Sequence, residues 1–256
     1  MLYPGLVSVT FRQLAPRAIA DLACEAGLEA IEWGGDVHVP PGDLVAAREV
    51  RRLTSGRGLR VAAYGSYFRF GPQQSWEPVL HTAVELGAPL IRVWAGDRAS
   101  SGADADYRER LADESRRVAQ AAGEYGIGVA YEFHANTLTD TLPSALELLA
   151  AVPHMRTLWQ PPHELAVETQ LVTLDAVLPR LANVHVFSWR GAGRERQPLA
   201  EGASLWQPAL HTLAHSGREH HVLLEFVVGD EPEQLRRDAA TLHGWLEHIH
   251  KEQPDG

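Results

Sequence analysis

Short apolar runs alternate with segments of helical periodicity along this whole 256-residue chain. The predicted strands begin at Gly5, Leu28, Leu59, Pro89, Ile127, Arg156, Asn183 and His221. Each run is followed by a polar or glycine-rich turn and then by a stretch with the 3.6-residue period of a helix that packs on a core. Several of these stretches end at a glycine, which accepts the left-handed conformation that closes a helix. The pattern predicts eight successive β/α units.

Eight such units, without a linker or a shift in composition, predict a single (β/α)8 TIM barrel over residues 1–250 and a short C-terminal tail over residues 251–256. An open doubly wound sheet is the main alternative. Such a sheet normally carries a glycine-rich phosphate turn after its first strand, and the segment SVTFRQLAP from Ser8 is not one. The barrel is therefore the expected fold.

Charge and composition restrict the partners of such a barrel. The formal net charge is −10, and an acidic surface repels phosphate backbones, so we expect a small sugar-like ligand rather than nucleic acid. The N-terminus lacks the features of a signal peptide, and no run reaches the roughly 20 apolar residues of a membrane span. We expect a cytoplasmic protein without a membrane partner. Its single cysteine, Cys24, excludes an internal disulfide and is expected to be buried.

Four of the later apolar runs each contain one side chain able to bind a hard metal ion. They are Glu132 in VAYEFH, Gln160 in TLWQPPH, His185 in NVHVFS and Glu225 in VLLEFV. Such groups are costly to bury unless they are paired or coordinated, and each alone could be a hydrogen-bonded core residue. Because the carboxyl ends of barrel strands meet at one face, four groups late in four successive strands predict one shared site. Oxygen ligands with one imidazole suit Mn²⁺, Mg²⁺, Co²⁺ or Zn²⁺.

The same segments carry a family resemblance. YEFH, WQPPH, HVFSW and LLEF, with WGGDVHVPPGD after the second run and RVWAG in the fourth, resemble the sugar isomerase/epimerase superfamily of xylose-isomerase-like (β/α)8 barrels. That group includes ketose 3-epimerases, hydroxypyruvate isomerases and inosose dehydratases, and is related to endonuclease IV. The resemblance covers nearly the whole chain. It implies one divalent ion, Mn²⁺ foremost, held by Glu132, Gln160, His185 and Glu225.

Gln160 departs from the family pattern, in which an acid is common at this position. A glutamine oxygen can still coordinate, but the site loses one formal negative charge. His163 matches the family's Asp-x-x-His spacing, and we expect it to contact a substrate hydroxyl or a metal-bound water. The alternative for His163 is a helix-capping or surface role.

Further residues are candidates for substrate binding. Glu32 ends the second run, where family members often place a substrate-contacting acid; its alternative is a structural partner for an arginine. His38 lies on a loop with proline and glycine, and it is either a ligand contact or an exposed turn residue. Trp94, with Trp33 and Trp189 as weaker candidates, could stack on a sugar ring.

The connection after the seventh run, SWRGAGRERQPLAEGAS, is long and rich in glycine, which indicates a lid or binding loop. Arg194 and Arg196 in it are candidates to bind a carboxylate, a phosphate or a polarised hydroxyl.

The resemblance implies a divalent-metal-dependent isomerase or epimerase acting on a sugar, a sugar phosphate or a keto-polyol. The reaction would pass through a metal-stabilised cis-enediolate, with Glu132 and Glu225 as acid and base. An inosose-type dehydratase is the nearest alternative, and a nuclease like endonuclease IV is disfavoured by the acidic charge. A non-catalytic sugar-binding barrel stays open because of Gln160. By analogy with barrel relatives, a homo-oligomer is also an expectation.

Overall fold

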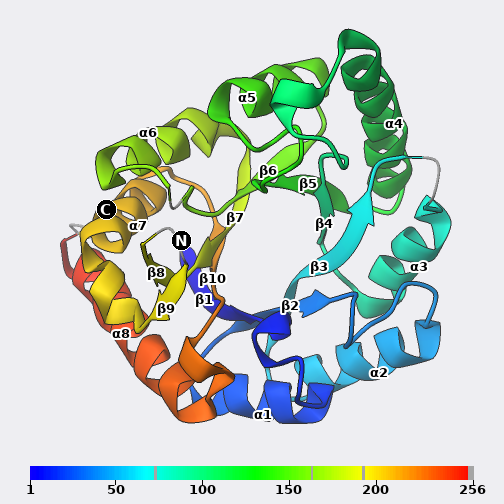
Figure 1. The fold of residues 1–256 in the computed structure, drawn as a ribbon. Coiled ribbons are helices and arrows are strands. Elements are labelled where there is room, and N and C mark those ends of the chain that lie inside the picture. Colours follow the sequence, from blue (N-terminus) through cyan, green and yellow to red (C-terminus); the bar gives the residue numbers. More distant parts are fainter. Residues whose placement is uncertain (72–73, 163, 192–193, 253–256) are drawn as a thin grey trace.

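The protein folds as the predicted closed barrel of parallel strands surrounded by helices (Figure 1). The computed structural model describes residues 1–71, 74–162, 164–191 and 194–252. The barrel strands, in their order around the barrel, are β1 (Leu2–Val7), β10 (His220–Leu224), β7 (Leu181–Val186), β6 (Arg156–Trp159), β5 (Gly128–Glu132), β4 (Leu90–Trp94), β3 (Arg60–Arg69) and β2 (Ala30–Gly34). The helices are α1 (Pro16–Glu25), α2 (Leu44–Ser55), α3 (Trp76–Leu86), α4 (Ala105–Gly123), α5 (Leu142–Ala151), α6 (Val167–Val177), α7 (Ala203–His215) and α8 (Pro232–Glu252).

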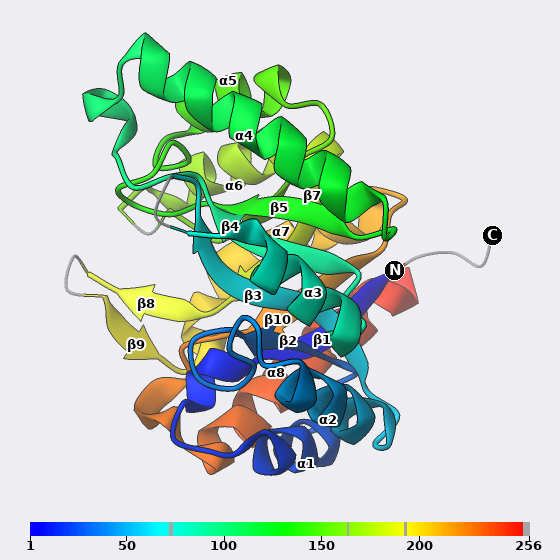
Figure 2. The ribbon, with the colours of Figure 1, turned by 90° about the vertical axis from the view of Figure 1, so that its right-hand side faces the viewer.

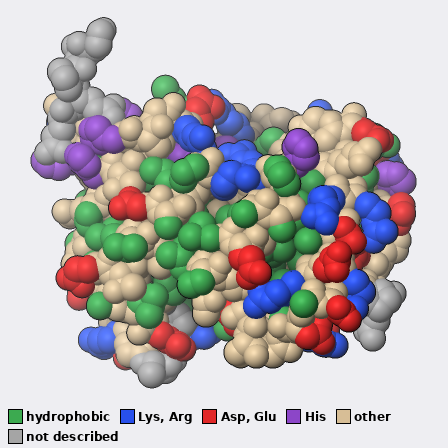
Figure 3. Space-filling view, turned by 90° about the horizontal axis from the view of Figure 1, so that it is seen from above, with side chains coloured by type: hydrophobic (Ala, Val, Ile, Leu, Met, Phe, Trp, Pro, Cys, Tyr) green, Lys and Arg blue, Asp and Glu red, His purple; other side chains and the backbone are tan. Residues whose placement is uncertain are grey.

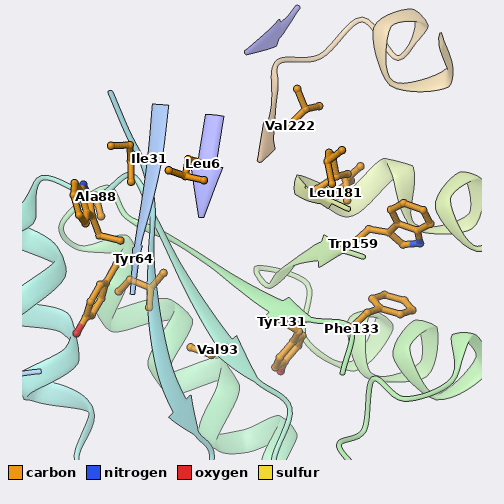
Figure 4. Packing of buried hydrophobic residues seen from close by; sticks show 14 of the residues in the cluster. Leu6, Ile31, Tyr64, Ala88, Val93, Tyr131, Phe133, Trp159, Leu181 and Val222 are labelled. Carbon is orange, nitrogen blue, oxygen red and sulfur yellow. The ribbon is translucent and has the colours of Figure 1, made fainter. Parts of the chain in front are cut away.

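The main hydrophobic core lies between the barrel and its helices, and the strand residues that face outward pack in it. Large side chains such as Trp33, Tyr131 and Trp159 are fully buried there. Figure 4 shows Tyr131 and Trp159 in this core. The indole of Trp33 donates to the Thr54 hydroxyl of α2 at 3.1 Å, which anchors this outward face. Because neighbouring residues on a strand point to opposite faces, Glu32 beside Trp33 and Glu132 beside Tyr131 point into the barrel.

Local signals fix where individual helices begin and end. Asp43 accepts a hydrogen bond from the amide of Ala46 at 2.9 Å at the start of α2, and Asp104 accepts one from Tyr107 at 2.8 Å at the start of α4. Gly87 ends α3 with φ of 70°, a conformation that favours glycine. These residues set the first turns of α2 and α4 and the last turn of α3.

The connection after β7, expected as a lid or binding loop, contains a short antiparallel hairpin of β8 (Ser188–Arg190) and β9 (Glu195–Gln197). Figure 2 shows the hairpin at the end of the barrel opposite the N-terminus, which is where the barrel strands end. The hairpin thus stands beside the barrel mouth.

Two details differ from expectation. Cys24 is exposed on α1, so its predicted burial was wrong. α8 continues to Glu252, two residues into the expected tail, and residues 253–256 lie outside the described part of the chain.

Among the helices of the described residues, none has both the length and the apolar character that crossing a membrane requires.

Candidate active site

A line of ion pairs crosses the barrel at the carboxyl ends of its strands. Glu225 Oε2, just after β10, lies 3.1 Å from His185 Nδ1 on β7. The other ring nitrogen of His185 lies 3.2 Å from Glu32 Oε2 on β2. Arg92 on β4 donates from Nε to Glu32 Oε1 at 2.6 Å and from Nη1 to Glu132 Oε2 on β5. Five side chains from five strands therefore form one connected network.

Glu132 is the most firmly held member of this network. Besides Arg92, the indole of Trp94 donates to its Oε2, and the amide of Gln160 donates to its Oε1 at 3.1 Å. The same Gln160 amide donates to the carbonyl of Phe133 at 2.5 Å. The Glu132 carboxylate is therefore fixed from three sides.

Gly65 on β3 makes room for the buried guanidinium of Arg92. A Cβ added at Gly65 would lie 2.5 Å from Arg92 Nη2 and 2.8 Å from Glu32 Oε1. Both neighbours are tied into the ion-pair network and cannot move aside freely. The absence of a side chain at residue 65 is therefore part of the site.

We expect Gly65→Ala to lower the free energy of unfolding by about 1–3 kcal/mol, because the added methyl overpacks a fixed cluster. Gly123→Ala is the matched control, since a Cβ there meets no described atom within 4 Å and helical alanine is favoured over glycine. Urea unfolding of both variants measures the difference. Equal stabilities for the two variants would show that the Arg92 cluster can accommodate a methyl group at Gly65.

The buried charges shift one another's protonation. Burial by itself raises the pKa of Glu32, but the charges of Arg92 and His185 and their hydrogen bonds outweigh it and lower that pKa to about 2. Burial by itself lowers the pKa of His185, but Glu225 and Glu32 outweigh it and raise that pKa to about 10. At neutral pH, without a bound cation, His185 is therefore protonated between two carboxylates.

This shift predicts a pH dependence of stability for the metal-free protein. Because the pKa of His185 is raised on folding, its contribution is complete below its ordinary pKa of 6.5 and is lost as pH rises through 10. We expect the free energy of unfolding to fall by about 1 kcal/mol per pH unit between these limits. Urea unfolding at pH 7, 8 and 9 with a chelator checks this, and His185→Gln should lack the slope. A wild-type stability independent of pH over this range would contradict the assignment.

The donors suit a divalent cation in their chemistry and their charge. His185 Nδ1 and Glu225 Oε2 are buried 3.1 Å apart, and neither has a hydrogen-bond partner besides the other among the described residues. Three carboxylates of the network face only two cationic groups, which leaves negative charge to neutralise. Among the described residues, however, no group of three or more His, Cys, Asp and Glu side chains is assembled as a metal cluster. We conclude that His185 and Glu225 fit a metal ion, while Glu132 is directed to Arg92 and Trp94.

A cavity of about 850 Å³ opens above the network. Glu132, Gln160 and Glu225 lie in its lining, as do Arg92 and Trp94. The volume is near the upper part of the range of about 300–1,000 Å³ for small-molecule sites.

Unusual backbone conformations are concentrated around this cavity. Five non-glycine residues in the described part of the chain have positive φ, and four of them line it: Tyr67 at 57°, Asn136 at 60°, Arg194 at 54° and Phe226 at 54°. Such conformations cost about 1–3 kcal/mol each and cluster at functional sites, where the surrounding structure imposes them. The strain supports this cavity as the functional site.

Aromatic side chains form two walls of the cavity. The Trp94 ring lies 5.2 Å from Tyr67 and 4.5 Å from His134, measured between ring centroids. On the other side, Trp189 of β8 lies 4.8 Å from Phe226, so the hairpin contributes to the wall. These rings offer flat apolar surfaces beside the polar floor.

The candidate residues differ in where the structure places them. Glu132, Gln160, Glu225, Trp94, Trp189 and Arg194 line the cavity. His185 and Glu32 lie fully buried in the ion-pair network, and Glu32 has the arginine partner that was its alternative role. His163 is outside the described residues.

Three other candidates lie away from the cavity lining. His38 is buried against Ser8, 2.9 Å from its hydroxyl, and burial lowers the pKa of its ring. Arg196 contacts Asp230 and donates to the carbonyl of Val227 at 3.1 Å. Trp33 faces α2. The structure therefore gives these residues positions in the supporting framework.

Arg92 is the main residue that the sequence analysis missed. It lies in PLIRVWA, an apolar run with one charged residue, so the criterion that selected Glu132 and Glu225 applies to it as well. Tyr67 and Arg12 also line the cavity, and Arg12 donates to the Tyr67 hydroxyl at 2.7 Å. Neither has a distinctive sequence signal, although Tyr67 lies late in β3 and Arg12 directly follows the short 3-10 helix of Ser8–Phe11.

Comparison with known proteins places this site in a family context. A family model described as xylose isomerase-like TIM barrel matches residues 20–247. The 3-dehydroshikimate dehydratase of Bacillus anthracis is 27% identical over 163 residues, which cover 59% of this chain and 58% of that protein. The match thus spans little more than half of the relative.

Solved structures share the fold at lower identity. A probable 3-DHS dehydratase from Bacillus anthracis superposes with a TM-score of 0.79 at 21% identity, over 95% of this chain and 99% of the other. The D-psicose 3-epimerase of Clostridium cellulolyticum H10 gives 0.73 at 15% identity, over 96% and 99%. A barrel protein from Mycobacterium smegmatis in complex with magnesium gives 0.73 at 12%, over 96% and 97%. With the family model matching most of its length, the chain belongs to the xylose isomerase-like TIM barrel family.

Proposed function

We propose that this protein is a divalent-metal-dependent isomerase or epimerase of a sugar, sugar phosphate or keto-polyol, with Glu132 and Glu225 as its acid and base. The observation that carries the proposal is the position of these two carboxylates. Both line the same cavity, and they approach it from β5 and β10, which β6 and β7 separate in the barrel. A substrate between them would present two faces to two different proton carriers.

The two carboxylates differ in how they are held, which suits different roles. Glu132 accepts hydrogen bonds from Arg92, Trp94 and Gln160, so its orientation is fixed before a substrate arrives. Glu225 Oε2 has no partner besides the His185 ring among the described residues, so it is more available to a ligand than Glu132 is. A fixed group and an available one on two sides of a carbon atom can remove a proton and return it. Return to the other face of the same carbon is epimerisation, and delivery to the adjacent carbon is isomerisation.

The remaining residues orient the substrate and limit water. Trp94 and Trp189 present aromatic faces on which the C–H surface of a ring can stack. Arg92 keeps a fixed positive charge next to Glu132 throughout the reaction. Glu225 and His185 would hold the metal ion, while Glu132 and Gln160, which the sequence predicts as further ligands, are hydrogen-bonded to each other at 3.1 Å in this structure. When bound, the ion would act as a Lewis acid toward the substrate's oxygen atoms.

Solvent-deuterium exchange tests this proposal. The protein with added Mn²⁺ is incubated in D₂O with a panel of ketoses and ketose phosphates, and the sugars are analysed by mass spectrometry and NMR. We expect one panel member to gain a single deuterium on carbon beside its carbonyl and to yield an epimer or isomer. Exchange should disappear in Glu225→Gln. No exchange into any panel member would leave a sugar-binding barrel as the better description.

A dehydratase is the second candidate, because the matched relative of Bacillus anthracis is a 3-dehydroshikimate dehydratase. The same proton removal beside a carbonyl, followed by loss of a β-hydroxyl, would make this site a lyase. The product then has the mass of the substrate less one water. Mass spectrometry of the reaction with 3-dehydroshikimate therefore separates the two candidates.

A further inference from the structure

We propose that the substrate carries an uncharged apolar group, which binds along a groove between the α5 and α6 sides of the cavity. This inference names a substrate class for the proposed function and rests on that function. The groove is the outer part of the same cavity. The polar network of Glu132, Gln160 and Glu225 would hold the reacting, hydroxylated part of the molecule.

The groove is defined by apolar residues from two successive β/α connections. They are Leu142, Pro143, Pro161, Pro162, Leu165 and Val172. Leu142 and Pro143 begin α5, Pro161 and Pro162 follow β6, and Val172 lies on α6. Because these segments belong to adjacent units of the barrel, their apolar side chains lie on neighbouring sides of the cavity that Gln160 also lines.

Two groove residues are exposed to an unusual degree for large hydrophobic side chains. Leu165 is 42% exposed and Val172 is 59% exposed. Figure 3 views the side of the molecule that α4, α5 and α6 cover, and hydrophobic side chains gather there among scattered charges. Exposed apolar side chains that line a binding cavity are typical of ligand contact.

The size of the cavity favours a ligand with two parts over a single sugar. Its volume of about 850 Å³ is several times that of a monosaccharide, and drug-sized molecules occupy sites of about 300–1,000 Å³. A lone sugar at Glu132 and Glu225 would leave the Leu165 and Val172 strip uncovered. An apolar group attached to the substrate would cover it.

The polar neighbours of the groove indicate the charge of that group. Asp140 and Glu164 line the cavity from the two connections that form the groove, and both are acidic, whereas the arginines of the lining come from other parts of the chain. They disfavour an anionic extension such as a phosphate or carboxylate. The groove and the catalytic carboxylates belong to one cavity. A separate ligand in the groove would have to share this cavity with the reacting molecule. We therefore infer that the group in the groove is part of the substrate.

Matched glycosides test the inference by binding alone. Isothermal titration calorimetry compares methyl with phenyl β-D-glucopyranoside, and methyl with phenyl β-D-galactopyranoside. We expect the phenyl member of at least one pair to bind about tenfold more tightly or better, as burial of a phenyl ring predicts. Val172→Asp, with Leu165→Asp as a second variant, should reduce this preference to less than about threefold and leave the affinity for the methyl glycoside unchanged.

Val45→Asp is the matched control, since Val45 is an exposed helical valine on α2, outside the lining of the cavity. It should retain the phenyl preference. Absence of a preference in both pairs would overturn the proposal, and so would a preference that Val172→Asp and Leu165→Asp leave unchanged. These outcomes are independent of turnover, so they are distinct from a failure of the isomerase proposal, which shows as absent deuterium exchange.

Discussion

Replacing Glu225 with glutamine is expected to lower kcat by about 10²- to 10⁴-fold, the contribution of a positioned general acid or base. Glutamine keeps the shape of the side chain but cannot take or give the proton. Glu225 lines the cavity, and its Oε2 lies 3.1 Å from Nδ1 of His185, so the change removes a buried ion pair, although the glutamine oxygen can still accept from the protonated ring. We therefore expect a folded variant that loses kcat and also loses the stability that the ion pair with His185 supplied.

The measurement combines steady-state kinetics on the substrate found by deuterium exchange with urea unfolding of the same preparation. Glu247→Gln, an exposed position on α8, is the control for the chemical change and should behave as wild type. Glu132→Gln is the informative comparison. It should also lose activity, but it breaks the buried ion pair with Arg92 instead of the pair with His185, and it should unfold more readily than wild type. A Glu225→Gln variant with kcat within tenfold of wild type would remove Glu225 from the chemistry.

The barrel itself was predictable because its signal is spread over the whole chain. Each of the predicted apolar runs corresponds to a barrel strand, and β/α alternation of this length closes into a barrel. The β8–β9 hairpin was not predicted, because its two strands have three residues each and carry no apolar alternation. Short elements of this kind depend on what they pack against.

The candidate site was predictable where the signal lay within one strand. A polar residue in an apolar run identified Glu132, Gln160 and Glu225, which share the cavity. Strand period also separates Trp33 from Glu32, since adjacent residues face opposite ways, and Trp33 indeed faces α2. The burial of His38 depends on Ser8, 30 residues away, a contact that local pattern cannot reveal.

The role of Glu32 shows the same limit. Substrate contact and pairing with an arginine were both compatible with its sequence context. The choice depends on Arg92, which lies 60 residues away on β4 and reaches Glu32 only because the barrel closes and Gly65 leaves space. The missing information was thus the identity of a distant partner.

Loss of Arg92, the distant partner of Glu32, should have a large effect on stability. We expect Arg92→Met to lower the free energy of unfolding by about 3–5 kcal/mol, the typical cost of removing one partner from a buried ion pair. Arg92, Glu32 and Glu132 are all almost inaccessible to solvent, so the two carboxylates would keep their buried positions without their shared cation. Methionine fills a similar volume, so the loss reports on charge more than on packing.

A double-mutant cycle distinguishes the charge effect from a general disturbance of the core. Arg92→Met combined with Glu32→Gln should be more stable than the single Arg92→Met variant, because one uncompensated charge is removed. The exposed pair of Arg236 and Glu25, with nitrogen and oxygen 2.9 Å apart, is the control and should couple by less than about 1 kcal/mol. Additive effects of the Arg92 and Glu32 substitutions would contradict the network. A strong coupling would show that Glu32 and Arg92 form a buried pair. That pair holds the Arg92 guanidinium in place next to Glu132 at the cavity.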